Sequence, residues 1–331
     1  MGRSSISNYN QQINILNAEY SRFSDTANLA LSKLGNVTNI DATREYLLQN
    51  VSKYEVIFIA LQNTIDRLIL DEAKRMNCIV TPTTGINHID NKYAIELGID
   101  IISLKGEVDF LKGITATAEL TWGLLLSLLR HIPVANQDVL KGIWLRDKYY
   151  GNELKNKTLG IIGYGRLGKM VARYGRAFQM SVIAFDRDQT SNDEYVRFMT
   201  LNELVSKSDI ITVHLSLNDE TQGIINENMF KQMKDGTILI NTARGEIIDE
   251  EAFLDALNSK KISAAIDVLA DEISLDNNWL KRNKLIKYAK KNDNLIITPH
   301  IGGVTYESVE LTNLFMIKKL EKYLSQNRVI K

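Results

Sequence analysis

The feature that most constrains the fold of this chain is a set of three glycines between an apolar run and an amphipathic helix. Residues 159–162 form the kind of short apolar run that is typical of a buried parallel strand. Gly163, Gly165 and Gly168 follow at G-x-G-x-x-G spacing. This spacing allows a tight turn, a close approach of a pyrophosphate and close packing of the next helix, whose dipole would face the phosphates. The motif therefore predicts a dinucleotide-binding unit.

A second apolar run, residues 182–185, ends in an acidic residue. Asp186 lies 18 residues after Gly168, where a carboxylate can accept hydrogen bonds from a ribose and would repel a 2′-phosphate. Asp186 therefore favours NAD over NADP as the cofactor. Arg187 follows directly and could serve a phosphate, which leaves NADP open as an alternative.

The composition excludes several classes of function. The 331 residues are enough for two domains, and 40 basic residues balance 40 acidic ones, so no net charge recruits nucleic acid or an anionic membrane. The single cysteine, Cys78, cannot form a disulfide within the chain, which fits a reducing compartment. The sequence shows no signal peptide and no apolar stretch of membrane length. We expect a cytoplasmic protein without a metal site.

The order of expected elements indicates an α/β protein with two doubly wound parallel sheets. Strands and helices alternate with short connections before the glycine motif and again after it. Gly35 is expected to end a helix over residues 27–34, and Pro133 to end a long apolar helix over residues 115–132. Residues 279–291 are predicted to form one long basic helix.

Three residues that can carry chemistry follow predicted strands in the second half. Ligands of parallel α/β sheets bind at the carboxyl ends of the strands. Arg244 offers a planar guanidinium that matches a carboxylate and can polarise a carbonyl. Glu272 could hydrogen-bond the imidazole of His300, and a carboxylate partner favours the protonated ring, which can donate a proton. Each residue alone would also suit a structural or solvated position.

Four motifs in this order resemble the NAD-dependent D-2-hydroxyacid dehydrogenase family, which includes D-3-phosphoglycerate, D-lactate and hydroxypyruvate enzymes. The motifs are Gly163-Tyr-Gly-Arg-Leu-Gly168, Asn241-Thr-Ala-Arg-Gly245, Ala265-Ile-Asp-Val268 with Glu272, and Thr298-Pro-His-Ile-Gly-Gly303. The resemblance extends from about residue 13 to near the end of the chain. It implies an oxidoreductase acting on CH–OH donors, which transfers a hydride between a D-2-hydroxy acid and NAD or reduces the 2-oxo acid with NADH.

The resemblance also implies roles for individual residues. Arg244 would bind the substrate, His300 would be the general acid/base and Glu272 would pair with His300. The substrate would be bound by Thr84, Gly85, Ile86, Arg244 and His300. The cofactor would be contacted by Gly163, Gly165, Arg166, Leu167, Gly168, Asp186, His214, Thr242, Ala243, Arg244, Asp267, His300 and Gly303. Within that set, Arg166 and Leu167 would face the pyrophosphate, and Asp267 would hold the nicotinamide carboxamide.

The family's architecture implies two domains, of which the substrate domain is built from two separate parts of the chain. Residues 1–112 with 302–331 would form a flavodoxin-like substrate domain, and residues 113–301 a Rossmann NAD-binding domain, with the site in a cleft between them. Members are usually homodimers through the NAD-binding domain, and the aromatic, basic segment 142–151 could pack on the second subunit. The other expected partner is a small 2-hydroxy or 2-oxo acid, with no nucleic acid and no membrane.

Some positions depart from the family pattern. Ser216 stands where a proline is usual, Thr115 where many members have asparagine, and residues 273–293 form a longer connection than usual. Thr81-Pro-Thr-Thr84 lacks the basic residue that would favour a substrate phosphate, which argues against 3-phosphoglycerate. Two alternatives stay open, an NAD-sensing protein similar to corepressors and an NADP-linked hydroxypyruvate or glyoxylate reductase. The sequence does not identify the substrate.

Overall fold

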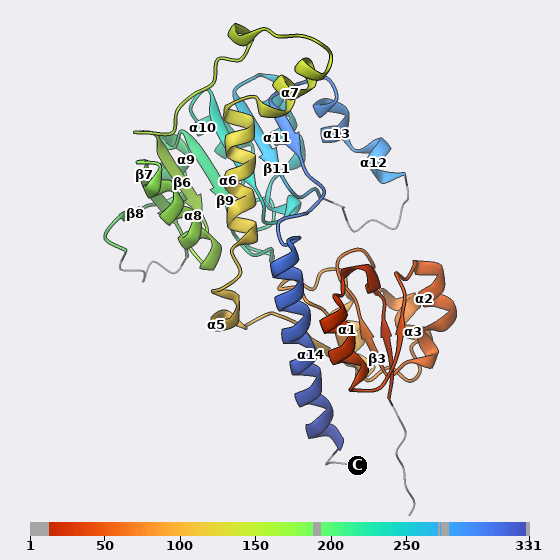
Figure 1. Ribbon diagram of the computed structural model, residues 1–331. Helices are drawn as coiled ribbons and strands as arrows, with labels where there is room; N and C mark the ends of the chain where they lie inside the picture. The colour runs from red at the N-terminus through yellow and green to blue at the C-terminus, as the bar shows by residue number, and fades with distance from the viewer. Residues whose placement is uncertain (1–12, 188–192, 271, 273–277, 329–331) are drawn as a thin grey trace, which may run out of the picture. The chain divides into compact units, whose positions relative to one another are not determined.

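Two compact units make up the chain. The structure, a computed structural model, describes residues 13–187, 193–270, 272 and 278–328 (Figure 1). Unit 1 is Met1–Leu111 with Thr305–Lys331, and unit 2 is Lys112–Val304. Each unit has its own parallel sheet. In the part of the chain that the structure describes, no helix is long and apolar enough to cross a bilayer.

The sheet of unit 1 has five parallel strands in the order β2-β1-β3-β4-β5, which is the flavodoxin order. Strands β3 and β4 are wholly apolar and buried, while the edge strands β2 and β5 are partly exposed. The topology changes direction between β1 and β3. The strands are β1 Asn14–Asn17, β2 Asn36–Asn39, β3 Val56–Phe58, β4 Cys78–Val80 and β5 Asp100–Ile102.

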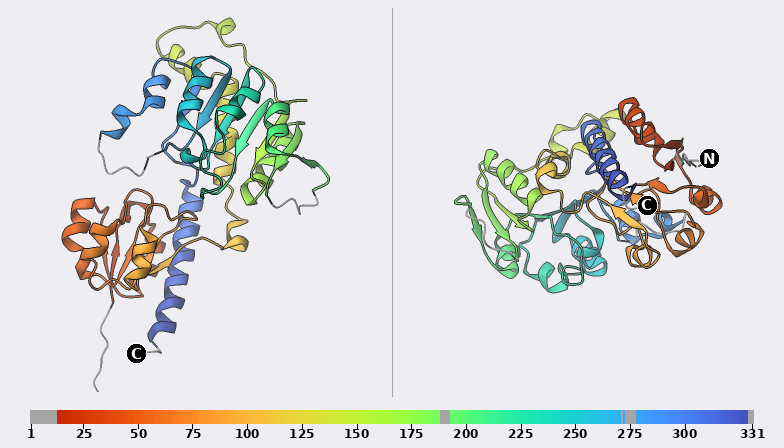
Figure 2. Two further views of the ribbon diagram at one scale, coloured as in Figure 1. Left: turned by 180° about the vertical axis from the view of Figure 1, so that it is seen from behind. Right: turned by 90° about the horizontal axis from the view of Figure 1, so that it is seen from below.

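Helices cover both faces of this sheet. Helix α1 packs on α14, and α3 packs on α2 and α4, so the two groups lie on opposite faces (Figure 2). Short polar side chains cap the starts of α1 to α4, where free N–H groups need acceptors. The helices are α1 Asp25–Ser32, α2 Arg44–Asn50, α3 Arg67–Glu72, α4 Asn91–Glu96, α5 Val108–Leu111 and α14 Tyr306–Arg328.

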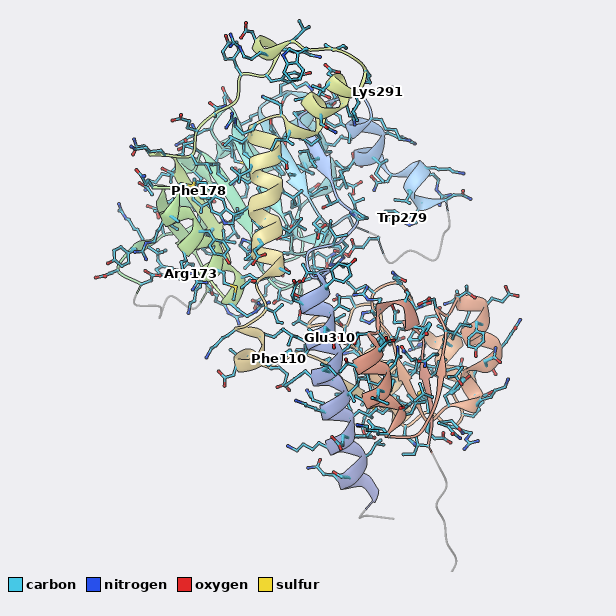
Figure 3. The ribbon with its side chains drawn as sticks, viewed as in Figure 1. Phe110, Arg173, Phe178, Trp279, Lys291 and Glu310 are labelled. Atoms are coloured by element: carbon cyan, nitrogen blue, oxygen red, sulfur yellow. The ribbon has the colours of Figure 1, made fainter. Side chains whose placement is uncertain are left out.

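Helix α14 returns the end of the chain to unit 1. The rings of Phe110, which is labelled in Figure 3, and Phe315 stack with their centroids 3.8 Å apart. The amide of Asn313 donates to the carbonyl of Arg22 at 2.9 Å. These contacts join segments about 200 to 290 residues apart in the sequence, which is why the unit is discontinuous.

The sheet of unit 2 has seven parallel strands in the order β12-β11-β10-β9-β6-β7-β8. The first six in chain order follow the Rossmann order, and the direction changes between β6 and β9. The predicted class, two doubly wound parallel sheets, is confirmed. The strands are β6 Thr158–Ile162, β7 Ser181–Phe185, β8 Val196–Phe198, β9 Ile210–Val213, β10 Thr237–Asn241, β11 Ile262–Ile266 and β12 Leu295–Ile297.

Two apolar cores lie on the two faces of this sheet. One core joins the sheet to α6 and α8, and the other joins it to α9, α10, α11 and α13. Helix α6 is the most apolar of these and contacts β10, β11 and β12. The helices are α6 Ala116–Leu129, α7 Ile132–Leu140, α8 Arg166–Ala177, α9 Leu201–Lys207, α10 Glu227–Gln232, α11 Glu250–Asn258, α12 Trp279–Arg282 and α13 Lys284–Ala289.

The predicted ends of two helices are wrong. Helix α6 ends at Leu129, His131 takes a left-handed backbone with φ 54°, and Pro133 lies in the first turn of α7 rather than after the end of α6. A proline is tolerated there because its missing N–H would have no helical partner. Gly35 ends no helix. It has no positive φ, and a Cβ on it would lie 2.2 Å from the carbonyl oxygen of Ile13.

The single helix predicted over residues 279–291 is also wrong. Helices α12 and α13 are separate because Asn283 has an extended backbone and its side chain caps the N–H of Ile286 at 3.0 Å. Residues 273–277 of the long connection lie outside the described residues.

Candidate active site

Each of the three positions in the motif requires glycine for a different physical reason. Gly163 has φ +96°, and a Cβ on it would lie 2.7 Å from the backbone of His214. A Cβ on Gly168 would lie 2.2 Å from the carbonyl oxygen of Gly163. A Cβ on Gly165, at the start of α8, would meet no atom within 4 Å. The first and third glycines are thus needed by the fold, and the second keeps the helix start open to a ligand such as a pyrophosphate.

The acidic residue after β7 is fixed to the glycine turn. The Asp186 carboxylate accepts a hydrogen bond from the backbone N–H of Tyr164 at 2.6 Å. The neighbouring Arg187 donates to Glu220 at 2.8 Å, and both side chains are exposed. Asp186 is therefore held beside the turn, while Arg187 is directed at a carboxylate.

The two residues predicted to face the pyrophosphate use their side chains elsewhere. The guanidinium of Arg166 donates to the carbonyl of Ile114 at 2.6 Å, and burial lowers its pKa from the ordinary value without discharging it. The side chain of Leu167 packs on the core shared with α6. Both residues lie in the first turn of α8, so their backbone N–H groups are what a phosphate would meet.

His214 is a buried, uncharged imidazole at the end of β9. Neither of its ring nitrogens, both buried, has a hydrogen-bond partner among the described residues. Burial lowers the pKa of His214 to about 4, so the ring is neutral at pH 7. Its backbone N–H donates to the carbonyl of Ile162 at 2.8 Å, which ties it to the strand that leads into the glycine turn.

The loop after β10 carries Arg244 and is built by Asn241. The Asn241 amide donates to the carbonyl of Arg244 at 2.8 Å and accepts from the N–H of Ala243 at 2.9 Å. The hydroxyl of Thr242 lies 3.0 Å from that of Thr121 on α6. The half-buried Arg244 guanidinium donates to the carbonyl of Ala243 at 2.7 Å. Asn241 therefore positions this loop, a role that its place in the sequence motif does not reveal.

Close backbone packing joins the Arg244 loop to the loop after β11. A Cβ on Gly245 would lie 2.1 Å from the backbone nitrogen of Ala270 and 2.2 Å from the carbonyl carbon of Leu269. The missing side chain at Gly245 therefore lets these two loops meet two residues before Glu272. Strands β10, β11 and β12 are neighbours in the sheet, so the loops that carry Arg244, Glu272 and His300 leave the same edge.

The side chains of His300 and Glu272 are joined by a hydrogen bond. His300 Nδ1 lies 2.6 Å from Glu272 Oε1, and the two side chains are 23% and 19% exposed. The second oxygen of Glu272 accepts from the N–H of Leu269 at 3.3 Å. With Nδ1 facing the carboxylate, Nε2 is the ring nitrogen that can exchange a proton with a substrate. His300 has a left-handed backbone with φ 52°, which is uncommon for a residue other than glycine.

Asp267 holds the loop that contains His300. Its carboxylate accepts from the hydroxyl of Thr298 at 2.5 Å and from the N–H groups of Ile301 and Gly302 at 2.9 and 2.7 Å. Its carbonyl accepts from the N–H of His300 at 2.8 Å. Burial raises the pKa of Asp267, and these hydrogen bonds oppose that effect. The predicted contact with a nicotinamide carboxamide stays a prediction.

The other predicted residues are divided between the two units. Gly303 is exposed in unit 2, with space around it. Thr84, Gly85 and Ile86 lie in the loop after β4 of unit 1, where Thr84 is exposed and the hydroxyl of Thr83 donates to the carbonyl of Gly85 at 2.7 Å. Among the described residues, no cluster of three His, Cys, Asp or Glu side chains could hold a metal ion.

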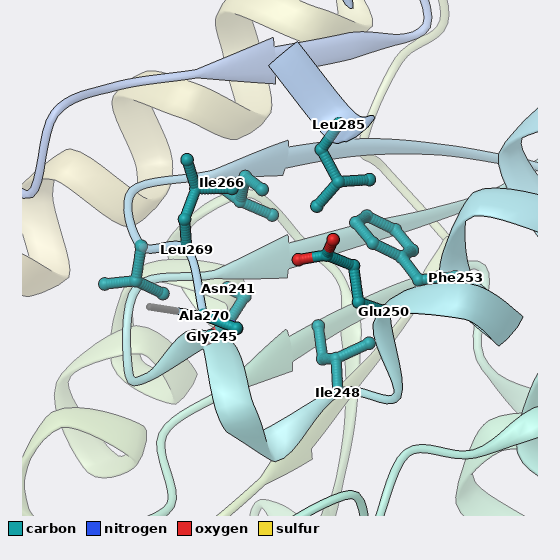
Figure 4. A pocket seen from close by; sticks show the side chains of 10 residues that line it. Asn241, Gly245, Ile248, Glu250, Phe253, Ile266, Leu269, Ala270 and Leu285 are labelled. Atoms are coloured by element: carbon teal, nitrogen blue, oxygen red, sulfur yellow. The ribbon is translucent and has the colours of Figure 1, made fainter. Parts of the chain in front are cut away.

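A small cavity lies beneath the Arg244 loop in unit 2 (Figure 4). Its lining is mostly apolar, and Arg244, Glu272 and His300 are not part of it. The cavity therefore belongs to the packing behind the loops, not to the reacting groups. It is lined by Asn241, Gly245, Ile248, Glu250, Phe253, Ile266, Val268, Leu269, Ala270 and Leu285.

Comparison with known proteins agrees with this geometry. Residues 122–302 match the family model described as D-isomer specific 2-hydroxyacid dehydrogenase, NAD binding domain. The chain is 34% identical over 289 residues to a hydroxypyruvate reductase of Thermotoga maritima, covering 87% of this chain and 90% of that protein. It is 36% identical over 271 residues to a D-3-phosphoglycerate dehydrogenase of Archaeoglobus fulgidus, covering 80% of this chain but only 49% of that protein.

A solved structure shows the same likeness over both units. The D-lactate dehydrogenase of Aquifex aeolicus, complexed with NAD and lactic acid, has a TM-score of 0.81 and 27% sequence identity. The similarity covers 95% of this chain and 96% of that one.

Proposed function

The chain belongs to the D-isomer-specific 2-hydroxyacid dehydrogenase family of NAD-dependent oxidoreductases, and we propose that it transfers a hydride between a D-2-hydroxy acid and NAD. The predicted family, enzyme class and cofactor are thereby confirmed. The observation that carries the reaction is the 2.6 Å pair of Glu272, after β11, and His300, after β12, at the same edge of the sheet as Arg244 after β10.

The residues of unit 2 fit an NAD molecule. The open position at Gly165 and the backbone N–H groups at the start of α8 suit a pyrophosphate, and Asp186 suits the ribose hydroxyls. When bound, NADH supplies the hydride and NAD accepts it. The neutral His214 and the backbone of Thr242 and Ala243 would line the remainder of the cofactor site.

Arg244 and His300 divide the work on the substrate. The guanidinium of Arg244 would bind the carboxylate and polarise the 2-oxo group, after giving up its bond to the Ala243 carbonyl. His300 Nε2 would give its proton to the carbonyl oxygen during reduction and take the hydroxyl proton during oxidation. Glu272 holds Nδ1 and stabilises the imidazolium before the proton is given.

The substrate we propose is an unphosphorylated 2-oxo or 2-hydroxy acid. The loop of Thr84, Gly85 and Ile86 in unit 1 would contribute backbone groups to the carboxylate, and residues 81–84 carry no basic side chain for a phosphate. Unit 1 would thus be the substrate domain. The pairing of Arg187 with Glu220 disfavours the NADP-linked alternative. Turnover of a 2-oxo acid is what distinguishes an enzyme from an NAD sensor.

We also propose a cytoplasmic homodimer formed through unit 2. The segment after α6 exposes large apolar side chains, among them Trp144 at 83% and Tyr150 at 81% exposure. Leu140 and Leu145 are exposed in the same segment. A second copy packed on this segment would remove that surface from water. Sedimentation analysis of the protein and of Trp144→Ser would test it, since a dimeric protein and a monomeric variant are expected.

The direct test is a panel of 2-oxo acids with NADH, followed by the loss of nicotinamide absorbance. We expect turnover of at least one unphosphorylated acid, with NADH preferred over NADPH. Tight binding of NADH without turnover of any acid in the panel would contradict the proposal and favour a sensor.

A further inference from the structure

Helix α6 touches both loops of the proposed active site through two threonines. Thr117 and Thr121 lie one helical turn apart and therefore share one face of α6. The hydroxyl of Thr117 donates to the carbonyl of Gly302 at 3.0 Å, two residues after His300. The hydroxyl of Thr121 lies 3.0 Å from that of Thr242, two residues before Arg244.

The number of hydrogens on the hydroxyl groups shows which threonine donates and which accepts. A threonine hydroxyl has one hydrogen to donate, and that of Thr121 goes to the carbonyl of Thr117 at 2.8 Å. The hydroxyl of Thr242 must therefore donate to Thr121. A continuous set of hydrogen bonds then runs from Thr242 through Thr121 to the backbone of Thr117, whose own hydroxyl bonds Gly302.

The helix that carries these threonines is anchored in the core of unit 2. Most of α6 is apolar and buried in the core of unit 2, and Thr121 is 1% exposed. Threonine is a poor helix former, and its bond to the carbonyl four residues back competes with the helix. The polar residues at these two buried or half-buried positions are therefore explained by their hydrogen bonds to the loops of His300 and Arg244.

The His300 loop needs such support on two sides. Asp267 binds the loop from β11 through its carboxylate, and Thr117 binds it from α6. Between these anchors His300 keeps a left-handed backbone that isolated chains avoid. The loop of Arg244 is also bound from two sides. Asn241 binds it from the end of β10, and Thr121 binds it from α6 through Thr242.

Resting on the proposed function, we propose that Thr117 and Thr121 are positioning residues for the reaction. Thr117 fixes the His300 loop, and Thr121 fixes the Arg244 loop, so that one helix sets the relative placement of the acid/base group and the substrate-binding guanidinium. A displacement near 1 Å at such a site can cost about 100-fold in rate.

The test uses isosteric and conservative variants. Thr117→Val and Thr121→Val remove each hydroxyl and keep the branched shape, while Thr117→Ser and Thr121→Ser keep the hydroxyl. The matched control is Thr312→Val in α14 of unit 1, which removes a similar bond to the carbonyl four residues back. We expect the control to keep kcat and KM within about twofold, the scatter of a surface change.

The two positions should separate kinetically. Thr117→Val should lower kcat about tenfold and shift the pH profile of kcat, because it moves the acid/base loop. Thr121→Val should mainly raise KM for the 2-oxo acid, about fivefold to tenfold, because it moves the arginine loop. NADH affinity should stay within about twofold in Thr117→Val, and in Thr121→Val it should change less than KM for the acid, because the Thr242 backbone also lines the cofactor site. Each serine variant should recover most of the loss.

An activity-independent readout separates this inference from the proposed function. The chain has four histidines, so imidazole NMR signals can be assigned by substitution. Thr117→Val should move the signals of His300 and leave those of His88 and His131 unchanged. If the wild type turns over no 2-oxo acid, the proposed function fails, and this spectrum alone decides the positioning role. Unchanged His300 signals, or kinetic losses that serine does not recover, would overturn it.

Discussion

The two units share one kind of sheet but use their strand ends differently. In unit 1 the polar residues at and just after the end of β1 are buried and bond to other parts of the unit: Asn17 donates to Asn39 at 2.9 Å, and Glu19 accepts from the N–H of Ala60 at 2.9 Å. In unit 2 the loops after β10 and β12 carry half-exposed groups, Arg244 and His300.

This difference shows that the topology of a sheet creates a potential binding site, and that the exposure of the polar groups there determines whether they can bind a ligand. Both sheets change direction between two central strands, where ligands of such folds bind. In unit 1 desolvation raises the pKa of the Glu19 carboxyl and favours its neutral form. In unit 2, partial exposure and hydrogen-bonded partners leave charged groups able to meet a substrate. Function therefore follows from the side chains placed on the fold.

The largest expected effect is at His300. Asparagine tolerates a left-handed backbone, so His300→Asn removes the acid/base group with little strain. We expect kcat to fall about 10²- to 10⁴-fold and the remaining rate to lose the pH dependence that a general acid imposes. His131→Asn is the control, since His131 has φ 54° and lies beyond the far end of α6. Steady-state rates across pH would measure both, and an unchanged profile for His300→Asn would discard the assignment.

The next effect is at Arg244. Arg244→Ala should lower kcat/KM about 100-fold or more, because the substrate carboxylate and the carbonyl both lose a charged donor. NADH affinity, measured by fluorescence titration, should change little. Arg173→Ala, on the exposed side of α8, is the control and should behave as the wild type. Equal losses in turnover and NADH binding would contradict the substrate role of Arg244.

A smaller effect is expected at Asp186. Asp186→Ala should raise KM for NADH roughly tenfold and narrow its advantage over NADPH, because the ribose loses an acceptor and the 2′-phosphate loses a repelling charge. Adding Glu220→Gln releases Arg187 from its ion pair and should improve use of NADPH further. If the ratio of kcat/KM for the two cofactors does not move, Asp186 does not select the cofactor.

The smallest effect is on stability, at Glu19 in unit 1. The pKa of Glu19 in the folded protein is raised above the ordinary value of 4.5. The protonated side chain therefore makes its full contribution to the free energy of unfolding below pH 4.5, and this contribution is lost as the pH rises through the raised pKa. Glu19→Gln stays neutral and should raise the melting temperature at pH 7 by roughly 2–4 °C, with no gain near pH 4. Thermal unfolding at both pH values measures this. A large loss of kcat in Glu19→Gln would break the contrast between the units.

Local patterns predicted the fold and much of the site. The glycine motif, the strand that ends at Asn241 and the pairing of His300 with Glu272 could be read because each depends on nearby sequence or on a known order of motifs. The predicted helix end at Pro133 and the unbroken helix predicted through Asn283 are wrong, because proline and asparagine occur on either side of a helix boundary. The contact of Thr117 with Gly302 spans 185 residues, and nothing in a single sequence joins two such positions.

The absent side chain at Gly245 has a practical consequence for anyone who would redesign this protein. Backbone atoms of residues 269 and 270 occupy the space where a methyl group would go, so even an alanine there would shift two loops together. Libraries aimed at new substrates should leave residues 241–245 and 267–272 unchanged. Residues 81–86 of unit 1 lie in a separate loop and can be varied without disturbing that packing.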